Sequence, residues 1–176
     1  LLKLSDSPRV WEEKVRPQPW FAKAQKIAAE RHFFHWELEF PEVFFEATGQ
    51  RKRNPGFDAV IGNPPWVNVQ SISTGFKEWL RRHYSIVRGK FDLYVPFFEL
   101  AHNVLRLHGF VGFIVSNKFM KSEYGTPLRH MLLTNFELKS LADLGDAPIF
   151  GDNVINYSAL CIAVREPGNP ASVIQG

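Results

Sequence analysis

The segment Asn63-Pro64-Pro65-Trp66 has the residue types needed to hold a flat molecule that carries an amino group. Two consecutive prolines fix the backbone and remove two N–H donors, so the carbonyl groups here have few neighbouring donors to engage them. The side-chain oxygen of Asn63 and the carbonyl of Pro64 could each accept one amine hydrogen, while Trp66 stacks on the ring. An ordinary strand-ending turn is the competing interpretation, because Asn and Pro are common in turns.

The residues around this segment predict the elements that position it. The apolar run from Phe57 to Ile61 is typical of a strand buried on both faces of a parallel sheet. Further along, apolar residues recur at three- and four-residue steps between Asp92, a predicted N-cap, and Gly109, and predict a helix. Open α/β sheets leave a crevice beyond the carboxyl ends of their strands, so we expect Asn63 to lie there.

The rest of the chain predicts alternating strands and helices. Helices are predicted over residues 20–31, 76–83 and 126–133, a loop over 48–56, and strands over 34–40, 110–115, 136–143 and 157–164. The last two strands have no helix-sized pattern between them and are expected to pair antiparallel. The predicted fold class is therefore a layered α/β domain with a largely parallel sheet and an antiparallel edge strand.

Composition bounds the class of protein. The chain has 176 residues, 45% of them hydrophobic and 22% charged, which suits one globular domain with a sizeable core. A single cysteine, Cys161, cannot form an internal disulfide. No run of about 18 apolar residues occurs, and residues 1–9 do not resemble a signal peptide, so we expect a cytoplasmic protein with no membrane partner. A net charge of +3 argues against a binder that works by electrostatics alone.

Residues 57–66 resemble the catalytic motif of DNA methyltransferases that methylate N6 of adenine, whose core reads Asn or Asp, Pro, Pro and an aromatic residue. Four further segments are similar to motifs of the same family in the same order: 35–44, 91–97, 109–119, and Ile149-Phe150 followed by 157–164. The likeness covers roughly residues 33–165 and implies a partial Rossmann-like methyltransferase domain, similar to the methylase domain of large restriction-modification fusion enzymes. Residues 1–32 would then form an N-terminal helical or linker segment, and 166–176 the start of a second linker.

The resemblance also implies a reaction. S-adenosyl-L-methionine would be the cofactor and DNA the partner, with Asn63 and Pro64 holding the amino group of a flipped adenine. By the family pattern, Trp66 and Phe150 would take the two faces of the base, and Phe97 would pack against the adenine ring of the cofactor. Burial in the core is the alternative for Phe97 and Phe150. Neither a nucleophilic side chain nor a metal is required, and the six histidines show no metal-ligand spacing.

The sequence also departs from the family. A glycine-rich loop normally precedes the Asn-Pro-Pro motif and binds the methionine part of the cofactor, yet no Gly-x-Gly occurs in this chain. A target-recognition region normally follows the last motif. We therefore expect the upstream cofactor-binding half and the downstream DNA reader to be missing, and the segment alone neither to bind the cofactor tightly nor to methylate.

Several other polar residues have simpler interpretations. Asp58 and Asp92 suit structural roles better than acid–base chemistry. The basic residues of 81–83, Arg88, Lys90 and Lys118 could contact DNA phosphate, but a solvated surface is the simpler interpretation. Two other functions stay open: methylation of an RNA adenine or a protein glutamine by the same motif, and a non-catalytic module that binds nucleic acid.

Overall fold

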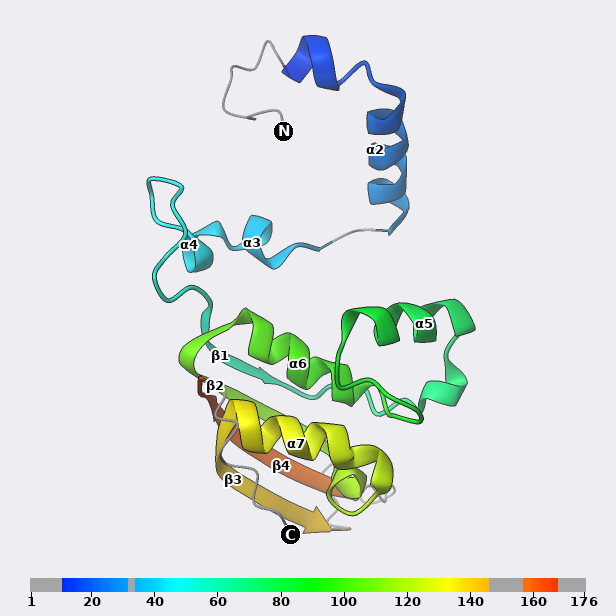
Figure 1. Ribbon diagram of the computed structural model, residues 1–176, viewed down its shortest axis with the longest axis vertical. Helices are drawn as coiled ribbons and strands as arrows, with labels where there is room; N and C mark the ends of the chain where they lie inside the picture. Colours follow the sequence, from blue (N-terminus) through cyan, green and yellow to red (C-terminus); the bar gives the residue numbers. More distant parts are fainter. Residues whose placement is uncertain (1–10, 32–33, 146–156, 168–176) are drawn as a thin grey trace. The chain divides into compact units, whose positions relative to one another are not determined.

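The computed structural model describes residues 11–31, 34–145 and 157–167 (Figure 1). The chain divides into two compact units, Leu1–Pro41 and Glu42–Gly176. The first unit contains a π-helical turn, η1 (Trp11–Val15), and two α-helices, α2 (Pro19–Arg31) and α3 (Trp36–Glu39). Helix α2 confirms the helix predicted over residues 20–31. A short helix, α4 (Pro41–Phe44), follows at the boundary between the units.

The strand predicted over residues 34–40 is wrong, because this segment forms the helical turn α3. The backbone N–H of Glu39 donates to the carbonyl of His35, and that of Phe40 to the carbonyl of Trp36. The helical turn stacks the rings of Trp36 and Phe40, whose centroids lie 6.2 Å apart at an interplanar angle of 22°. Alternating apolar residues make a strand only where a second strand pairs with them, and the described sheet offers no such partner to this segment.

The second unit is built on a four-stranded sheet. The strands are β1 (Phe57–Gly62), β2 (Leu105–Ser116), β3 (Phe136–Gly145) and β4 (Ser158–Arg165), in the spatial order β1-β2-β4-β3. Strand β1 pairs with β2 in parallel, and β4 pairs antiparallel with both β2 and β3. The mixed α/β class and the antiparallel β3–β4 pair are therefore confirmed. The antiparallel strand is expected at the edge of the sheet, but the reversed strand, β4, lies one place in from the edge. The connection from β2 to β3 skips one position in the sheet, and β4 occupies that position.

Three helices of the second unit confirm predicted ones: α5 (Thr74–His83), α6 (Tyr94–Val104) and α7 (Thr126–Asn135). Helices α6 and α7 lie over the same face of the sheet (Figure 1). Three 3₁₀ turns join these elements: η2 (Val69–Ser71), η3 (Asn117–Met120) and η4 (Glu123–Gly125). Helix α6 ends at Val104 and not at the predicted Gly109, because Leu105 already pairs with Phe57 as the start of β2.

The hydrophobic core lies between the sheet and the two covering helices. Val111, Phe113 and Val115 point from β2 into this core. There the ring of Phe98 packs edge-on against that of Phe113, with the ring centroids 5.1 Å apart. Strand β1 contradicts the prediction of burial on both faces, since Ile61 is 83% exposed. In the described part of the chain, β1 has one neighbouring strand and helices cover one face of the sheet, which leaves its other face open. No helix among the described residues has the length and apolar character needed to cross a membrane.

Candidate active site

The segment Asn63–Trp66 leaves the sheet at the carboxyl end of β1, as predicted. Gly62, the last residue of β1, is in register with Phe113 of the parallel neighbour β2, so both strands run toward this end of the sheet. Asn63 and Pro65 are exposed, whereas Pro64 is buried. Trp66 is partly buried and packs against the core. The motif is thus anchored through Pro64 and Trp66 and displays Asn63 outward.

A short antiparallel ladder holds the chain directly after Trp66. The N–H of Leu93 donates to the carbonyl of Val67 at 2.8 Å, and the N–H of Val69 donates to the carbonyl of Phe91 at 3.0 Å. Residues 68 and 92 face each other in this ladder as an isolated β-bridge. The ladder therefore fixes the exit of the motif to the residues that lead into α6.

Asp92 sits at the centre of a partly buried polar network and is itself only 9% exposed. One oxygen of its carboxylate accepts from Asn68 Nδ2 at 3.2 Å, and the other accepts from the Tyr124 hydroxyl at 3.1 Å. The predicted N-cap role is wrong, because the cap residue of α6 is Leu93, with no side-chain cap bond. Such a carboxylate stabilises the fold only while its donors are in place.

Tyr94 and Tyr124 extend the network toward the core. Their hydroxyl oxygens lie 3.5 Å apart, and Tyr94 is fully buried. Burial raises the pKa of Tyr94 and also that of Tyr124, with the Asp92 carboxylate acting in the same direction. Both hydroxyls therefore stay protonated at neutral pH and remain able to donate.

Sequence reasoning missed Asn68 and Tyr124 as partners in this site. The one available signal was a carboxylate at position 92 within the apolar run from Phe91 to Pro96. A charged group in such a run needs hydrogen-bonding partners, but the sequence does not say which residues supply them.

Two adjacent phenylalanines on α6 divide between core and surface. Phe98 is fully buried, whereas Phe97 is 36% exposed. Phe97 follows Leu93 by about one helical turn. Because the backbone of Leu93 is hydrogen-bonded to Val67, the ladder holds this part of α6 beside the motif. Burial in the core, the alternative interpretation of Phe97, therefore describes its neighbour Phe98 better. Phe150, the other predicted aromatic contact, lies outside the described residues.

The exit of β2 is fixed by a second set of hydrogen bonds. Asn117 Nδ2 donates to the Asp143 carboxylate at 2.8 Å, and the Gly145 N–H donates to the same oxygen at 3.1 Å. These two donors, Asn117 first, hold the pKa of Asp143 below its usual range. Lys118, the next residue after Asn117, is exposed.

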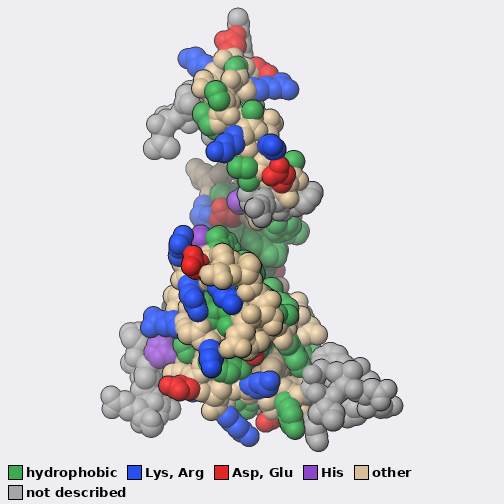
Figure 2. Space-filling model, turned by 90° about the vertical axis from the view of Figure 1, so that its right-hand side faces the viewer, with side chains coloured by type: hydrophobic (Ala, Val, Ile, Leu, Met, Phe, Trp, Pro, Cys, Tyr) green, Lys and Arg blue, Asp and Glu red, His purple; other side chains and the backbone are tan. Residues whose placement is uncertain are grey.

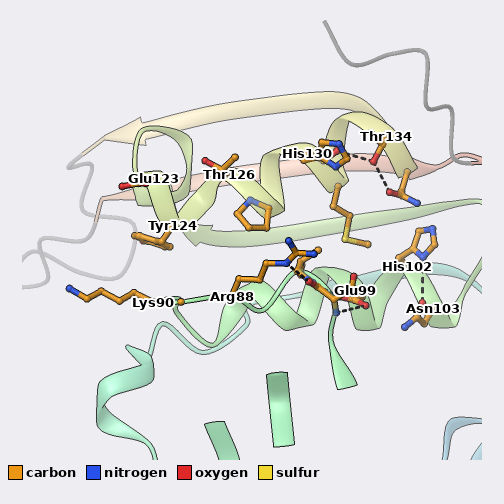
Figure 3. Close-up of a pocket in the computed structure, with 16 residues that line it drawn as sticks. Arg88, Lys90, Glu99, His102, Asn103, Glu123, Tyr124, Thr126, His130 and Thr134 are labelled. Carbon is orange, nitrogen blue, oxygen red and sulfur yellow. Dashed lines mark hydrogen bonds between the residues drawn. The ribbon is translucent and has the colours of Figure 1, made fainter. Parts of the chain in front are cut away.

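An open cleft of about 1250 Å³ lies elsewhere in the second unit (Figure 3). Its walls come from residues 85–90 and α6 on one side, and from η4 and α7 on the other, with Arg88, Lys90, Glu99, Tyr124 and His130 among the side chains that line it. Neither the motif residues nor Phe97 line this cleft, but Tyr124, which donates to Asp92, lies in its wall. Within the three described stretches, no three His, Cys, Asp or Glu side chains come together as a metal site.

Comparison with known proteins identifies the family. The sequence pattern of the Eco57I restriction-modification methylase matches residues 2–150. The type II methyltransferase M.PaeR7I of Pseudomonas aeruginosa is 37% identical over 117 residues, which cover 66% of this chain and 20% of that protein. The adenine-specific methyltransferase PglX of Streptomyces coelicolor is 40% identical over 82 residues, covering 42% of this chain and 7% of that protein. The chain thus spans about a fifth or less of the length of these relatives.

The fold also has a solved counterpart. A Listeria monocytogenes protein described as a candidate class I S-adenosylmethionine-dependent methyltransferase superposes with a TM-score of 0.51 at 14% identity, covering 64% of this chain and 32% of that one. The predicted family and the predicted Rossmann-like fold are confirmed, and both findings agree with S-adenosylmethionine as the cofactor. The chain belongs to the Eco57I restriction-modification methylase family.

Proposed function

We propose that residues 33–165 form the catalytic portion of a DNA adenine-N6 methyltransferase of a restriction-modification or phage-defence system. The observation that carries the proposal is the display of Asn63 at the end of β1, on a segment held by Pro64, Trp66 and the ladder behind them. Two relatives support it: the type II methyltransferase M.PaeR7I and PglX, which is named as an adenine-specific methyltransferase.

The chemistry follows from the acceptors of the motif. The lone pair of the adenine N6 atom is delocalised into the ring, which makes the nitrogen a poor nucleophile. If the Asn63 side-chain oxygen and the Pro64 carbonyl each accept one N6 hydrogen, the nitrogen becomes more pyramidal and its lone pair is aimed at the incoming methyl group. This is positioning combined with electrostatic stabilisation, and it needs no covalent intermediate with the protein.

The target base must leave the duplex to reach Asn63. Flipping an adenine costs a few kcal/mol of stacking and pairing, which contacts in the pocket must offset. We propose Trp66 for one face of the base, because this residue is only partly buried, and Phe150 for the other face by the family pattern.

The described residues fit one part of the cofactor. When bound, S-adenosylmethionine supplies an electrophilic methyl carbon on its sulfonium sulfur. Phe97 offers an exposed ring on α6 for the adenine end. The chain has no Gly-x-Gly loop for the methionine end. We therefore propose that an upstream segment completes the cofactor site and that a downstream region reads the DNA sequence.

Substitution of Asn63 tests the proposal. In the protein that includes the proposed upstream segment, Asn63→Ala should lower methyl transfer to DNA by about 10²- to 10³-fold, as expected for loss of one preorganised acceptor. Asn63→Asp keeps an acceptor oxygen and should retain more activity. Asn103→Ala, an exposed amide on α6, is the matched control. Labelled cofactor is supplied with DNA, RNA or protein, and label is counted in each.

The possible outcomes separate the functions that the motif allows. Label in DNA that survives Asn63→Ala would contradict the mechanism. Label only in RNA or protein would favour the alternative substrates, and no transfer at all would favour a non-catalytic module. Calorimetry on the 176-residue chain alone should show no tight binding of S-adenosylmethionine, and micromolar affinity would refute the proposed need for an upstream segment.

A further inference from the structure

Residues 74–90, which comprise α5 and the loop after it, concentrate positive charge. They contain five Lys or Arg residues and one Glu, so this stretch is more positive than the chain as a whole, whose net charge is +3. Figure 2 looks at the molecule from the side of α5 in Figure 1, and Lys and Arg side chains gather across this face of the second unit among hydrophobic ones. A local excess of this kind attracts polyanions even when the overall charge is small.

Helix α5 also carries an exposed row of stacked rings. The rings of Phe76 and Trp79 stack with their centroids 6.0 Å apart and an interplanar angle of 17°. Trp79 also stacks on the ring of His83, with a centroid distance of 4.3 Å and an interplanar angle of 22°. Phe76 is 44% exposed and Trp79 46% exposed, although Leu80 on the same helix is buried in the core. The helix therefore has a core-facing anchor and, in addition, an aromatic surface that core packing does not explain.

The loop after α5 holds its cations in a fixed place. The Glu99 carboxylate accepts from the N–H groups of Ser85 and Ile86 at 3.0 and 3.1 Å. The Arg81 side chain donates to the carbonyl of Gly89 at 3.1 Å. Arg88 and Lys90 are exposed on this loop. Preorganised cations lose less entropy on binding an anion than cations on a mobile loop.

This surface lies beside the candidate active site. Helix α5 follows the motif along the chain, and it is found at the end of the sheet toward which β1 and β2 run (Figure 1). Lys90 directly precedes Phe91, whose carbonyl belongs to the ladder behind the motif. The cations are thus connected to the residues that hold the reaction centre.

We infer that α5 and residues 84–90 bind the backbone of the DNA strand next to the flipped base, with Arg88 and Lys90 on phosphates and Phe76 against a base or sugar. The inference rests on the proposed function for the identity of the nucleic acid. Cations neutralise phosphates and release counterions, and an aromatic ring adds stacking without regard to sequence, so the two features together match a nucleic-acid strand. An acidic protein segment is the competing occupant, but such a segment has no bases to stack on a row of flat rings.

Binding of the full chain to a fluorescent DNA duplex tests the inference by anisotropy. Lys90→Glu and Arg88→Glu should each weaken binding by about tenfold or more at 0.1 M salt, and each should reduce the slope of log affinity against log salt by about one unit. Lys139→Glu on β3, at the opposite edge of the sheet from β1, is the matched control and should bind like the wild type. Phe76→Ala should weaken binding by about fivefold to a hundredfold, against Leu138→Ala as its control.

The outcomes distinguish this inference from the proposed function. Wild-type affinity in the α5 variants, with folding verified by circular dichroism, would overturn it, as would a wild-type chain that does not bind DNA. Equal losses in the β3 controls would also overturn it, because they would indicate a diffuse charge effect. If the α5 variants lose affinity for DNA while the protein that includes the upstream segment shows no methyl transfer, the proposed function fails and the DNA surface stands.

Discussion

The candidate site is made from two stretches that the fold treats in opposite ways. Residues 91–94, which lead into α6 and include its first residue, are mostly buried and hydrogen-bonded to the chain behind the motif, and Asp92 has two side-chain donors. Residues 62–65, from the last residue of β1 onward, are exposed except for Pro64. The difference indicates two roles: the buried stretch keeps the site rigid, and the exposed stretch presents a polar group to an incoming molecule. Two pairs of substitutions, on α6 and at Asp92, and two single ones, at Asp143 and Asn63, test this difference.

The largest expected effect on stability comes from the neighbouring phenylalanines of α6. Phe98→Ala should lower the free energy of unfolding by about 3–5 kcal/mol, because a fully buried ring leaves a cavity against Phe113. Phe97→Ala should cost less than about 1 kcal/mol, since its ring is partly exposed. Urea unfolding followed by circular dichroism measures both. Equal losses would mean that Phe97 is also a core residue, which would remove the argument for its contact with the cofactor.

A smaller effect is expected from the carboxylate of the buried stretch. Asp92→Ala should destabilise the protein by about 1–3 kcal/mol, because Asn68 and Tyr124 lose their acceptor in a partly buried place. Asp92→Asn keeps one acceptor oxygen and should cost less. Asp58→Ala is the matched control: its carboxylate is 86% exposed and pairs with Arg106 at 2.6 Å, and such surface pairs contribute about 0–1 kcal/mol. A loss at Asp58 that equals the loss at Asp92 would contradict the anchoring role.

A still smaller effect is expected as a pH dependence of stability at the end of β2. Asn117 and the Gly145 N–H lower the pKa of Asp143, so the folded state binds a proton there less readily than the unfolded state does. The stability from this group is therefore present above the usual Asp pKa of about 4 and is lost as the pH falls through the lowered value. Asp143→Asn should lose less stability on acidification than the wild type. Urea midpoints between pH 3 and pH 6 measure this, and parallel curves would show that the hydrogen bonds do not favour the charged form.

Asn63 offers a direct check on the exposed stretch. Its substitution by Ala should leave the urea midpoint near that of the wild type, because an exposed side chain contributes little to folding. A large loss of stability would mean that Asn63 belongs to the anchor, and a loss of methyl transfer could then no longer be assigned to chemistry alone.

The sequence predicted most of the helices and strands of the second unit, because their apolar residues recur with clear periods and because Gly and Pro separate them. It failed for residues 34–40, where Trp36 and Phe40 stack within a helical turn although their alternation is typical of a strand. It also failed at the end of α6, since pairing of Leu105 with Phe57 determines where the helix stops. Both failures concern choices that depend on which partner strand is present.

By itself the sequence determined the chemistry at the motif: two prolines without N–H donors, an amide oxygen and a ring will have those properties in any fold. Only the tertiary structure decided that Asn63 is displayed, that Asp92 binds Asn68 and Tyr124, and that Phe76 and Trp79 line the surface beside the cations of α5. The physical reason is that donors, acceptors and local spacing are properties of residues, whereas exposure and contact between distant residues arise only when the sheet and its helices pack together.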